Sequence, residues 1–224
     1  MSPSKPWNSR LERYSTDVLT VYFDFLCPYA WRGIELLSSL DVEFEPVHYS
    51  VVQGNHADNK GLPRAAPVWK LSEQPMQTED AYQRESLTAF IASHAAAQQG
   101  AALHRAFILA LFRLRHRDSS GLDAAAMLEA ARLAKLDLER FASDQRDESA
   151  RRVELSRDLE RAGQLGVFGT PTIQLGDGQA AYFRFATLPA SQPAQLQAWT
   201  LFLNALSSDA NIETIKRAKP GATA

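Results

Sequence analysis

The only cysteine of the 224-residue chain lies where an apolar run gives way to a helical pattern. The run from Val18 to Leu26 is rich in β-branched and aromatic residues, which is typical of a strand buried in a parallel or mixed sheet. Pro28 follows Cys27, and proline is favoured at the first helical position, so Cys27 is predicted to be a helix N-cap. Unpaired N–H groups at that end favour a negative charge and hence a thiolate. The predicted chemistry is that of a nucleophilic or ligand-facing thiol.

A second candidate motif lies about 140 residues further on, in the segment GVFGTPT that begins at Gly166. The dipeptide Thr170-Pro171 opens an apolar run that ends at Leu175, and a glycine-bounded turn follows. The short run 180–185 comes next, so an antiparallel hairpin is predicted.

The elements around Cys27 predict a βαβ unit. The helix after Pro28 has an apolar stripe that can face a sheet, and a second strand is predicted over 42–49. Such a unit implies a right-handed crossover and parallel strands. Residues 53–75 are rich in proline and glycine and are predicted to be a long loop. The stripe comprises Ala30, Gly33, Ile34, Leu37 and Leu40.

Between residues 78 and 163 the pattern becomes helical, and this segment is predicted to be a subdomain inserted into the 17–206 domain. The stretch from Ala101 to Leu114 is apolar on most of its circumference and is predicted to be its core helix. A loose arm over 1–16 and a polar tail over 207–224 complete the predicted organisation. The predicted helices are 79–98, 101–117, 122–135, 137–145 and 147–162, with a final helix at 192–206.

Composition limits the function classes. A formal charge of −2 gives no bulk reason to expect nucleic acid or an anionic membrane as a partner. The polar start has no secretory apolar region, and no run approaches the length of a membrane span. One cysteine excludes an intramolecular disulfide and a multi-cysteine metal cluster. His94, His104 and His116 show no metal-like spacing, so no metal site is expected, and nothing in the spacing pairs His48 with Cys27. The polar start and the lack of a spanning run predict a cytoplasmic location.

The motifs CPYA and GVFGTPT, in this order and with helices between them, resemble the DsbA-like branch of the thioredoxin superfamily. The similarity includes FrnE-like oxidoreductases, mycothiol-dependent reductases, kappa-class glutathione transferases and 2-hydroxychromene-2-carboxylate isomerases. The resemblance covers roughly Val18 to Leu206 and implies an α/β thioredoxin fold with an α-helical insertion subdomain.

The resemblance also implies roles for individual residues. Cys27 matches the nucleophilic cysteine of a CxxC motif, and Pro171 matches a cis-proline beside it. Ala30 occupies the place of the second, resolving cysteine, so an outside thiol must release a mixed disulfide. The expected substrate-binding residues are Pro28, Tyr29, Ala30, Trp31, Arg32, Phe168, Gly169, Thr170 and Pro171.

Several neighbours of the thiol have two interpretations. Tyr29 can pack on a ligand or be an ordinary surface aromatic, and Trp31 can line a pocket or lie buried under the helical block. Arg32 can add positive potential near the thiolate or only solvate its helix. Asp24 can shuttle a proton, although a buried carboxylate more often accepts backbone hydrogen bonds.

Three functions remain open. The leading one is a monothiol thiol-disulfide oxidoreductase with no tightly bound cofactor, using a small thiol such as glutathione, bacillithiol or mycothiol. Its substrate would be a small thiol or disulfide; protein disulfides and a homodimer are also left open. The second is a thiol-cofactor transferase or isomerase. The third is a non-catalytic peptide-binding module.

Overall fold

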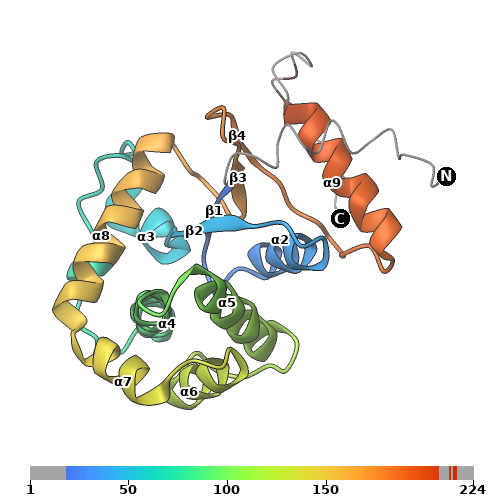
Figure 1. The fold of residues 1–224 in the computed structure, drawn as a ribbon. Helices are drawn as coiled ribbons and strands as arrows, with labels where there is room; N and C mark the ends of the chain where they lie inside the picture. The colour runs from blue at the N-terminus through green and yellow to red at the C-terminus, as the bar shows by residue number, and fades with distance from the viewer. Residues whose placement is uncertain (1–18, 207–211, 213, 216–224) are drawn as a thin grey trace, which may run out of the picture.

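A mixed sheet of four strands lies at the centre of the computed structural model, which describes residues 19–206, 212, 214 and 215 (Figure 1). β1 pairs in parallel with β2 on one side and antiparallel with β3 on the other, and β3 pairs antiparallel with β4. The predicted βαβ unit and the predicted hairpin are therefore confirmed in one sheet. In sheet order the strands are β2 (Phe44–His48), β1 (Leu19–Phe23), β3 (Thr172–Gln174) and β4 (Ala180–Tyr182).

The strands are shorter than the sequence predicts. β1 ends at Phe23, because the Asp24 carboxylate accepts the backbone N–H groups of Leu26 and Val51 and the chain turns there. The predicted strand over 42–49 and the two runs of the predicted hairpin likewise shrink to the residues that pair with a neighbour. Local pattern shows which residues are apolar, but cross-strand pairing decides where a strand ends.

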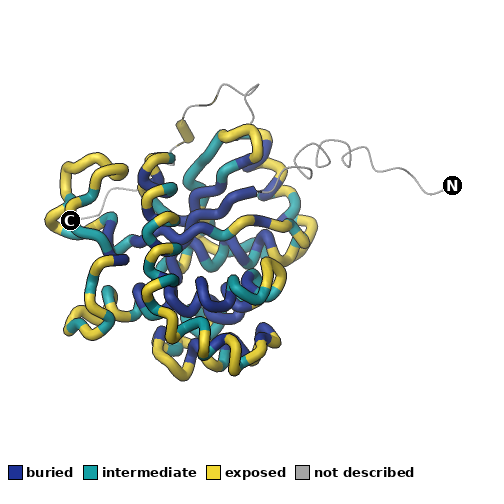
Figure 2. The backbone as a smooth tube through the Cα atoms, turned by 60° about the vertical axis from the view of Figure 1, so that its left-hand side comes forward, coloured by how far each residue is buried: buried dark blue, intermediate teal, exposed yellow. Residues whose placement is uncertain are grey.

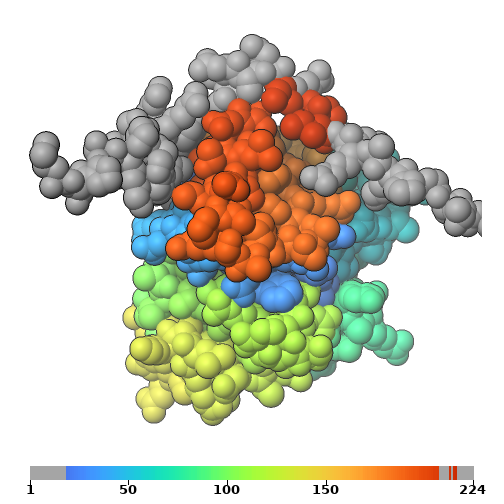
Figure 3. Space-filling model, turned by 90° about the vertical axis from the view of Figure 1, so that its right-hand side faces the viewer, coloured from blue at the N-terminus to red at the C-terminus, as the bar shows by residue number. Residues whose placement is uncertain are grey.

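Different helices cover the two faces of the sheet, as the alternation of side chains along β1 requires. Val21 and Phe23 belong to the main core cluster, which includes residues of α2 (Pro28–Ser39) and α9 (Gln192–Leu206). Tyr22 belongs to a second cluster with Ala162 of α8 (Glu148–Leu165). In Figure 3 the orange part of the chain, toward the C-terminus, lies above the blue part, and the green and yellow parts lie below.

The predicted helical insertion is present between β2 and β3. α4 contacts α5, α6, α7 and α8 and is more deeply buried than α5, so the prediction that 101–114 forms the core helix is wrong. Aspartate side chains cap four of these helices by accepting a backbone N–H three residues on, which explains where each begins. The insertion comprises α4 (Ala81–Ala97), α5 (Ala101–His116), α6 (Ala124–Leu133), α7 (Leu138–Arg146) and α8.

The segment predicted as a long loop over 53–75 contains short helices. α3 (Val51–Asn55) is capped by the Ser50 hydroxyl, which accepts the N–H of Gln53. Two 3₁₀ turns follow at Ala57–Asn59 and Leu71–Glu73. The Asn59 amide oxygen accepts the N–H groups of Val68 and Trp69, so side-chain hydrogen bonds tie the segment together. Single turns of this kind leave no hydrophobic periodicity to detect.

In the described part of the chain, buried residues lie at the centre and exposed residues lie in the outer turns (Figure 2). No helix in its described part is long and apolar enough to cross a membrane. The predicted arm over 1–16 and most of the predicted tail over 207–224 lie outside the described residues. The division into arm, domain and tail therefore stays a prediction.

Candidate active site

Cys27 lies at the N-cap of α2, at the end of the strand pair where β1 and β2 finish. Its backbone is extended, with φ −93° and ψ 112°, and Pro28 begins the helix as predicted. The half-buried thiol donates a hydrogen bond to the carbonyl oxygen of Thr170, with Sγ and O 3.3 Å apart. The Thr170–Pro171 peptide bond is cis. The structure thus brings together two motifs that are 143 residues apart.

A glycine allows the proline loop to approach α2 closely. A Cβ at Gly33 would lie 2.8 Å from Cγ of Pro171, which is closer than two carbon atoms can pack. Pro171 is buried, and its carbonyl oxygen accepts the backbone N–H of Phe183. The sheet therefore fixes the proline loop from behind while Gly33 lets it reach the thiol.

The predicted site residues differ in exposure, and therefore in whether a substrate can contact them. Pro28 is exposed, Tyr29 is half-buried, and the Phe168 ring is 62% exposed. Ala30 is fully buried, so its side chain cannot contact a substrate. The expected binding residues with exposed surface therefore lie on the first turn of α2 and in the segment just before Pro171.

Trp31 points toward the helical insertion. Its ring stacks on His116 of α5, with centroids 5.7 Å apart, and its indole N–H donates to the Glu35 carboxylate. Glu35 in turn accepts two hydrogen bonds from the Arg113 guanidinium. Burial acts to raise the pKa of Glu35, but the hydrogen bonds from Arg113 and Trp31 hold it below its usual value. The indole therefore attaches α2 to α5, which matches the burial interpretation.

Arg184 and Tyr182 lie beside the predicted site residue Tyr29 but are not among the predicted site residues themselves. The exposed Arg184 guanidinium carbon lies 4.5 Å from the ring centroid of Tyr29 and 5.6 Å from that of Tyr182. Arg32 lies 5.3 Å from the same Tyr29 centroid and donates to the carbonyl oxygen of Phe185. The run Tyr182 to Phe185 looks like an ordinary strand in the sequence, so only tertiary structure places these residues here.

Family comparison identifies the domain. The family model described as the DSBA-like thioredoxin domain matches residues 18–198. The chain belongs to this family. The resemblance stated from CPYA and GVFGTPT is thereby confirmed, and so is the thioredoxin fold with its helical insertion. No curated protein matches the sequence.

Solved structures share the fold of this DsbA-like domain at low sequence identity. A probable DsbA oxidoreductase from Streptomyces coelicolor is 18% identical with a TM-score of 0.55, covering 93% of this chain and 95% of its own. The cytosolic disulfide reductase DsbM from Pseudomonas aeruginosa, solved with GSH, is 17% identical with a TM-score of 0.53, covering 83% and 98%. A 2-hydroxychromene-2-carboxylate isomerase is 16% identical with a TM-score of 0.58, covering 83% and 94%.

Asp24 of the DsbA-like domain is fully buried three residues before the thiol. Its two carboxylate oxygens accept the N–H groups of Leu26 and Val51, at 2.9 and 2.7 Å. Burial raises the pKa of Asp24 to about 7, although these two hydrogen bonds act in the opposite direction. The hydrogen bond that the Cys27 thiol donates goes to Thr170 instead, so Asp24 serves the backbone at the end of β1.

This raised pKa predicts a pH-dependent loss of stability. Between the ordinary value of 3.8 and about pH 7, the unfolded chain loses the Asp24 proton and the folded chain keeps it. The free energy of unfolding should therefore fall with rising pH in this window, by up to about 4 kcal/mol from this group alone. Buried His48 and His104, whose pKa values burial lowers, impose the opposite slope below pH 6.5.

The contribution of Asp24 is isolated by denaturant unfolding of the wild type and Asp24→Asn across this pH range. We expect the stability of the wild type to fall relative to the variant as pH rises. The exposed Asp177→Asn serves as the control and should leave the slope unchanged. Parallel curves for wild type and Asp24→Asn contradict the prediction.

A buried polar cluster lies on the opposite side of β2 from β1. His48, His94 and Asp158 each place one ligand-capable atom within 4.8 Å of the others. Asp158 Oδ2 accepts both the backbone N–H and the Nδ1–H of His48, at 3.0 and 2.6 Å. Burial acts to raise the pKa of Asp158, but hydrogen bonds from the two histidines hold it well below its usual value.

Two imidazole nitrogens and a carboxylate oxygen suit a divalent metal. However, Oδ2 of Asp158 already accepts two hydrogen bonds from His48. Asp158 joins β2 to α8, and His94 Nε2 on α4 lies 3.4 Å from the same oxygen. We interpret the cluster as a structural link among three elements. Sequence spacing does not reveal it, because its members come from three separate segments.

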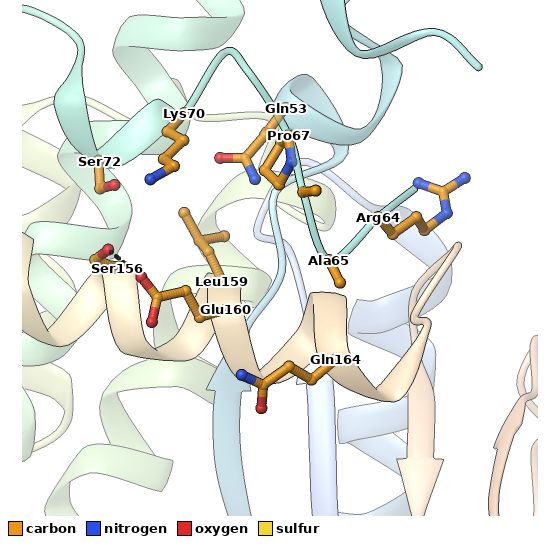
Figure 4. Close-up of a pocket in the computed structure, with 11 residues that line it drawn as sticks. Gln53, Arg64, Ala65, Pro67, Lys70, Ser72, Ser156, Leu159, Glu160 and Gln164 are labelled. Carbon is orange, nitrogen blue, oxygen red and sulfur yellow. Dashed lines mark hydrogen bonds between the residues drawn. The ribbon is translucent and has the colours of Figure 1, made fainter. Parts of the chain in front are cut away.

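A cavity of about 370 Å³ lies between the 64–72 segment and α8, away from the thiol (Figure 4). Its lining is largely polar and carries both signs of charge, and Ser156 donates to Glu160 across one turn of α8. Neither Cys27 nor the Thr170–Pro171 segment lines it. Its lining residues include Gln53, Arg64, Lys70, Ser72, Ser156, Glu160 and Gln164.

Proposed function

We propose that this DsbA-like domain is a monothiol thiol-disulfide oxidoreductase, in which Cys27 is the catalytic nucleophile and a small thiol resolves the mixed disulfide. The observation that carries the proposal is the half-buried Cys27 thiol at a helix N-terminus, hydrogen-bonded to Thr170 O. The N-terminal end of a helix is a favourable position for a negatively charged group. Pro28 and Phe168 leave exposed surface beside it for a substrate.

The reaction is two exchanges. Deprotonated Cys27 attacks one sulfur of a disulfide, the sulfur–sulfur bond breaks, and the other half leaves as a thiolate. An external thiolate then attacks the mixed disulfide and releases Cys27, carrying the first half away as a new disulfide. The external thiolate thereby replaces the half that left in the first exchange, one disulfide is converted into another, and the protein returns unchanged. A second external thiolate that attacks the new disulfide completes the two-electron reduction of the original one. Ala30 cannot perform the second attack, so the resolving thiol comes from solution.

Backbone groups of the proline loop are proposed to position the substrate. The carbonyl oxygen of Thr170 already accepts the thiol hydrogen, and it is released for another partner once the proton is lost. An extended peptide or a small cysteine-containing molecule can pair with the backbone of this loop as an added strand does. DsbM, a cytosolic disulfide reductase solved with GSH, shares this fold, which supports glutathione as the first thiol to test and a cytoplasmic setting.

The test is the intact mass of the protein after incubation with oxidised glutathione. We expect one glutathionyl group per chain, removed by reduced glutathione or dithiothreitol. Cys27→Ser is the control, and it should acquire no adduct. Bacillithiol disulfide is tested in parallel, since the structure favours no single thiol by name.

The same experiment separates this function from the alternatives. A Cys27 that stays unmodified in every disulfide overturns the proposal and favours a non-catalytic binding module. An adduct that forms but is not released by any external thiol contradicts the proposed second step. In that case a thiol-cofactor transferase or isomerase becomes the better hypothesis, and a 2-hydroxychromene-2-carboxylate isomerase shares this fold.

A further inference from the structure

We propose that the surface beside Cys27 selects anionic small disulfides and thiols, with Arg184 as a specificity-determining residue. This inference rests on the proposed function and goes beyond it, because it assigns a charge class to the substrate. Arg184, Arg32 and Tyr29 carry it, and together they are called the arginine–tyrosine cluster below.

The arginine–tyrosine cluster adjoins the thiol through two connected elements. Tyr29 is two residues beyond Cys27 on the first turn of α2. On the other side, Gly169 precedes the residue whose carbonyl accepts the thiol hydrogen, and a Cβ there would lie 3.0 Å from the Tyr182 ring. Arg184 lies over both Tyr29 and Tyr182. Its charge is therefore held beside the place where a disulfide must approach.

Both guanidinium groups lie near the same aromatic ring without a carboxylate partner. Their carbons are 4.5 and 5.3 Å from the Tyr29 centroid, which is the range of a cation–π contact. Among the described residues, no carboxylate lies within the 4.0 Å of an ion pair with either arginine. Two like charges gathered at one ring repel each other, and an anion placed between or beside them relieves that repulsion.

Other arginines of this chain are neutralised by carboxylates. Arg113, also beside α2, forms two hydrogen bonds of 2.7 and 2.8 Å to the Glu35 carboxylate. Arg161 likewise holds Glu45. Arg32 instead donates to the Phe185 carbonyl, which fixes its position but leaves its charge uncompensated. The positive potential near Cys27 is thus available to a carboxylate of the substrate.

A small substrate would place its disulfide at the Cys27 thiol and its carboxylate at Arg184, which lies over Tyr29 on the first turn of α2. Guanidinium groups bind carboxylates through charge-assisted hydrogen bonds. At separations of about 4 Å, one exposed charge pair changes a rate by about threefold to tenfold. The preference should weaken in salt, since the screening length is about 10 Å at 0.1 M.

The experiment compares rates of mixed-disulfide formation at Cys27 with three short disulfides of different charge. These are dithiodipropionate, which is anionic, hydroxyethyl disulfide, which is neutral, and cystamine, which is cationic. Each rate is divided by that of a free small thiol with the same disulfide, which removes the intrinsic reactivity of the reagent. The readout is the ratio of the anionic to the neutral rate, and of the neutral to the cationic rate.

The variants are Arg184→Gln and Arg184→Glu, with Arg157→Gln as the matched control. Arg157 is exposed on α8, so its substitution changes the net charge equally at a distance from the thiol. We expect the anionic preference to fall about threefold to tenfold in Arg184→Gln and to reverse in Arg184→Glu. Arg157→Gln should retain the wild-type ratios, and all variants should keep the wild-type melting temperature within a few degrees.

Outcomes for the two proposals are distinguishable. If Cys27 reacts with all three disulfides at similar normalised rates, or if Arg157→Gln has the same effect as Arg184→Gln, the charge selection is wrong and the oxidoreductase proposal stands. If Cys27 reacts with none of them, the oxidoreductase proposal falls and takes this inference with it.

Discussion

Replacing Ala30 with cysteine should convert the protein into a dithiol that closes an internal disulfide with Cys27 upon oxidation. Residues three apart at the start of a helix bring their side chains within disulfide distance. The reduced variant should then reduce insulin roughly tenfold or more faster than the wild type with dithiothreitol, because the resolving thiol becomes intramolecular. Thiol counting after oxidation and the turbidity of insulin measure the two effects.

The structure also predicts that Ala30→Cys is less stable than the wild type in its reduced form. Ala30 is fully buried in the main core cluster, so the added sulfur should reduce the free energy of unfolding by about 1 to 3 kcal/mol in the reduced form. Ala30→Ser is the matched control, since it adds an atom at the same place without a thiol. A folded Ala30→Cys variant that stays inert toward insulin would show that the site is not built for protein disulfides. The transferase or isomerase and the binding module would then rank above a protein-disulfide reductase.

The second large effect is expected far from the thiol, at Asp158. Asp158→Ala should lower the free energy of unfolding at pH 7 by about 2 to 5 kcal/mol, because two N–H donors of His48 lose their acceptor and each buried donor left unpaired costs about 1 to 3 kcal/mol. The variant leaves the backbone N–H and the imidazole of His48 without their acceptor. The imidazole is packed against the rings of Phe23 and Phe90, which offer no replacement acceptor. Denaturant unfolding measures the loss.

Glu160→Ala is the control for Asp158→Ala. Glu160 is exposed, two residues further along α8, and its replacement should change stability by no more than about 0.5 kcal/mol. Equal stabilities for wild type and Asp158→Ala would show that the cluster does not hold β2, α4 and α8 together. Bound zinc that disappears in Asp158→Ala would contradict the structural interpretation and assign the cluster to a metal.

Local chemistry explains why parts of the site could be predicted from the sequence. The N-cap position of Cys27 depends on Pro28 beside it and on the apolar run before it, both of which are contiguous in the chain. The helix starts in the insertion likewise depend on aspartates within one turn. The pairing of Cys27 with Thr170 came from the family resemblance, because nothing local connects residues 143 apart.

The sequence by itself thus determined the fold class, the inserted helices and the identity of the thiol and its proline loop. Tertiary structure alone decided that the Asp24 carboxylate accepts the Val51 N–H, that His48 and Asp158 are linked across 110 residues, and that Arg184 lies over Tyr29. It also decided that Trp31 attaches α2 to α5 and that α4 is the most buried helix of the insertion. The physical reason is the range of the interactions: helix caps and apolar periodicity act within a few residues, whereas burial, charge pairing and ring contacts depend on which distant segments pack together.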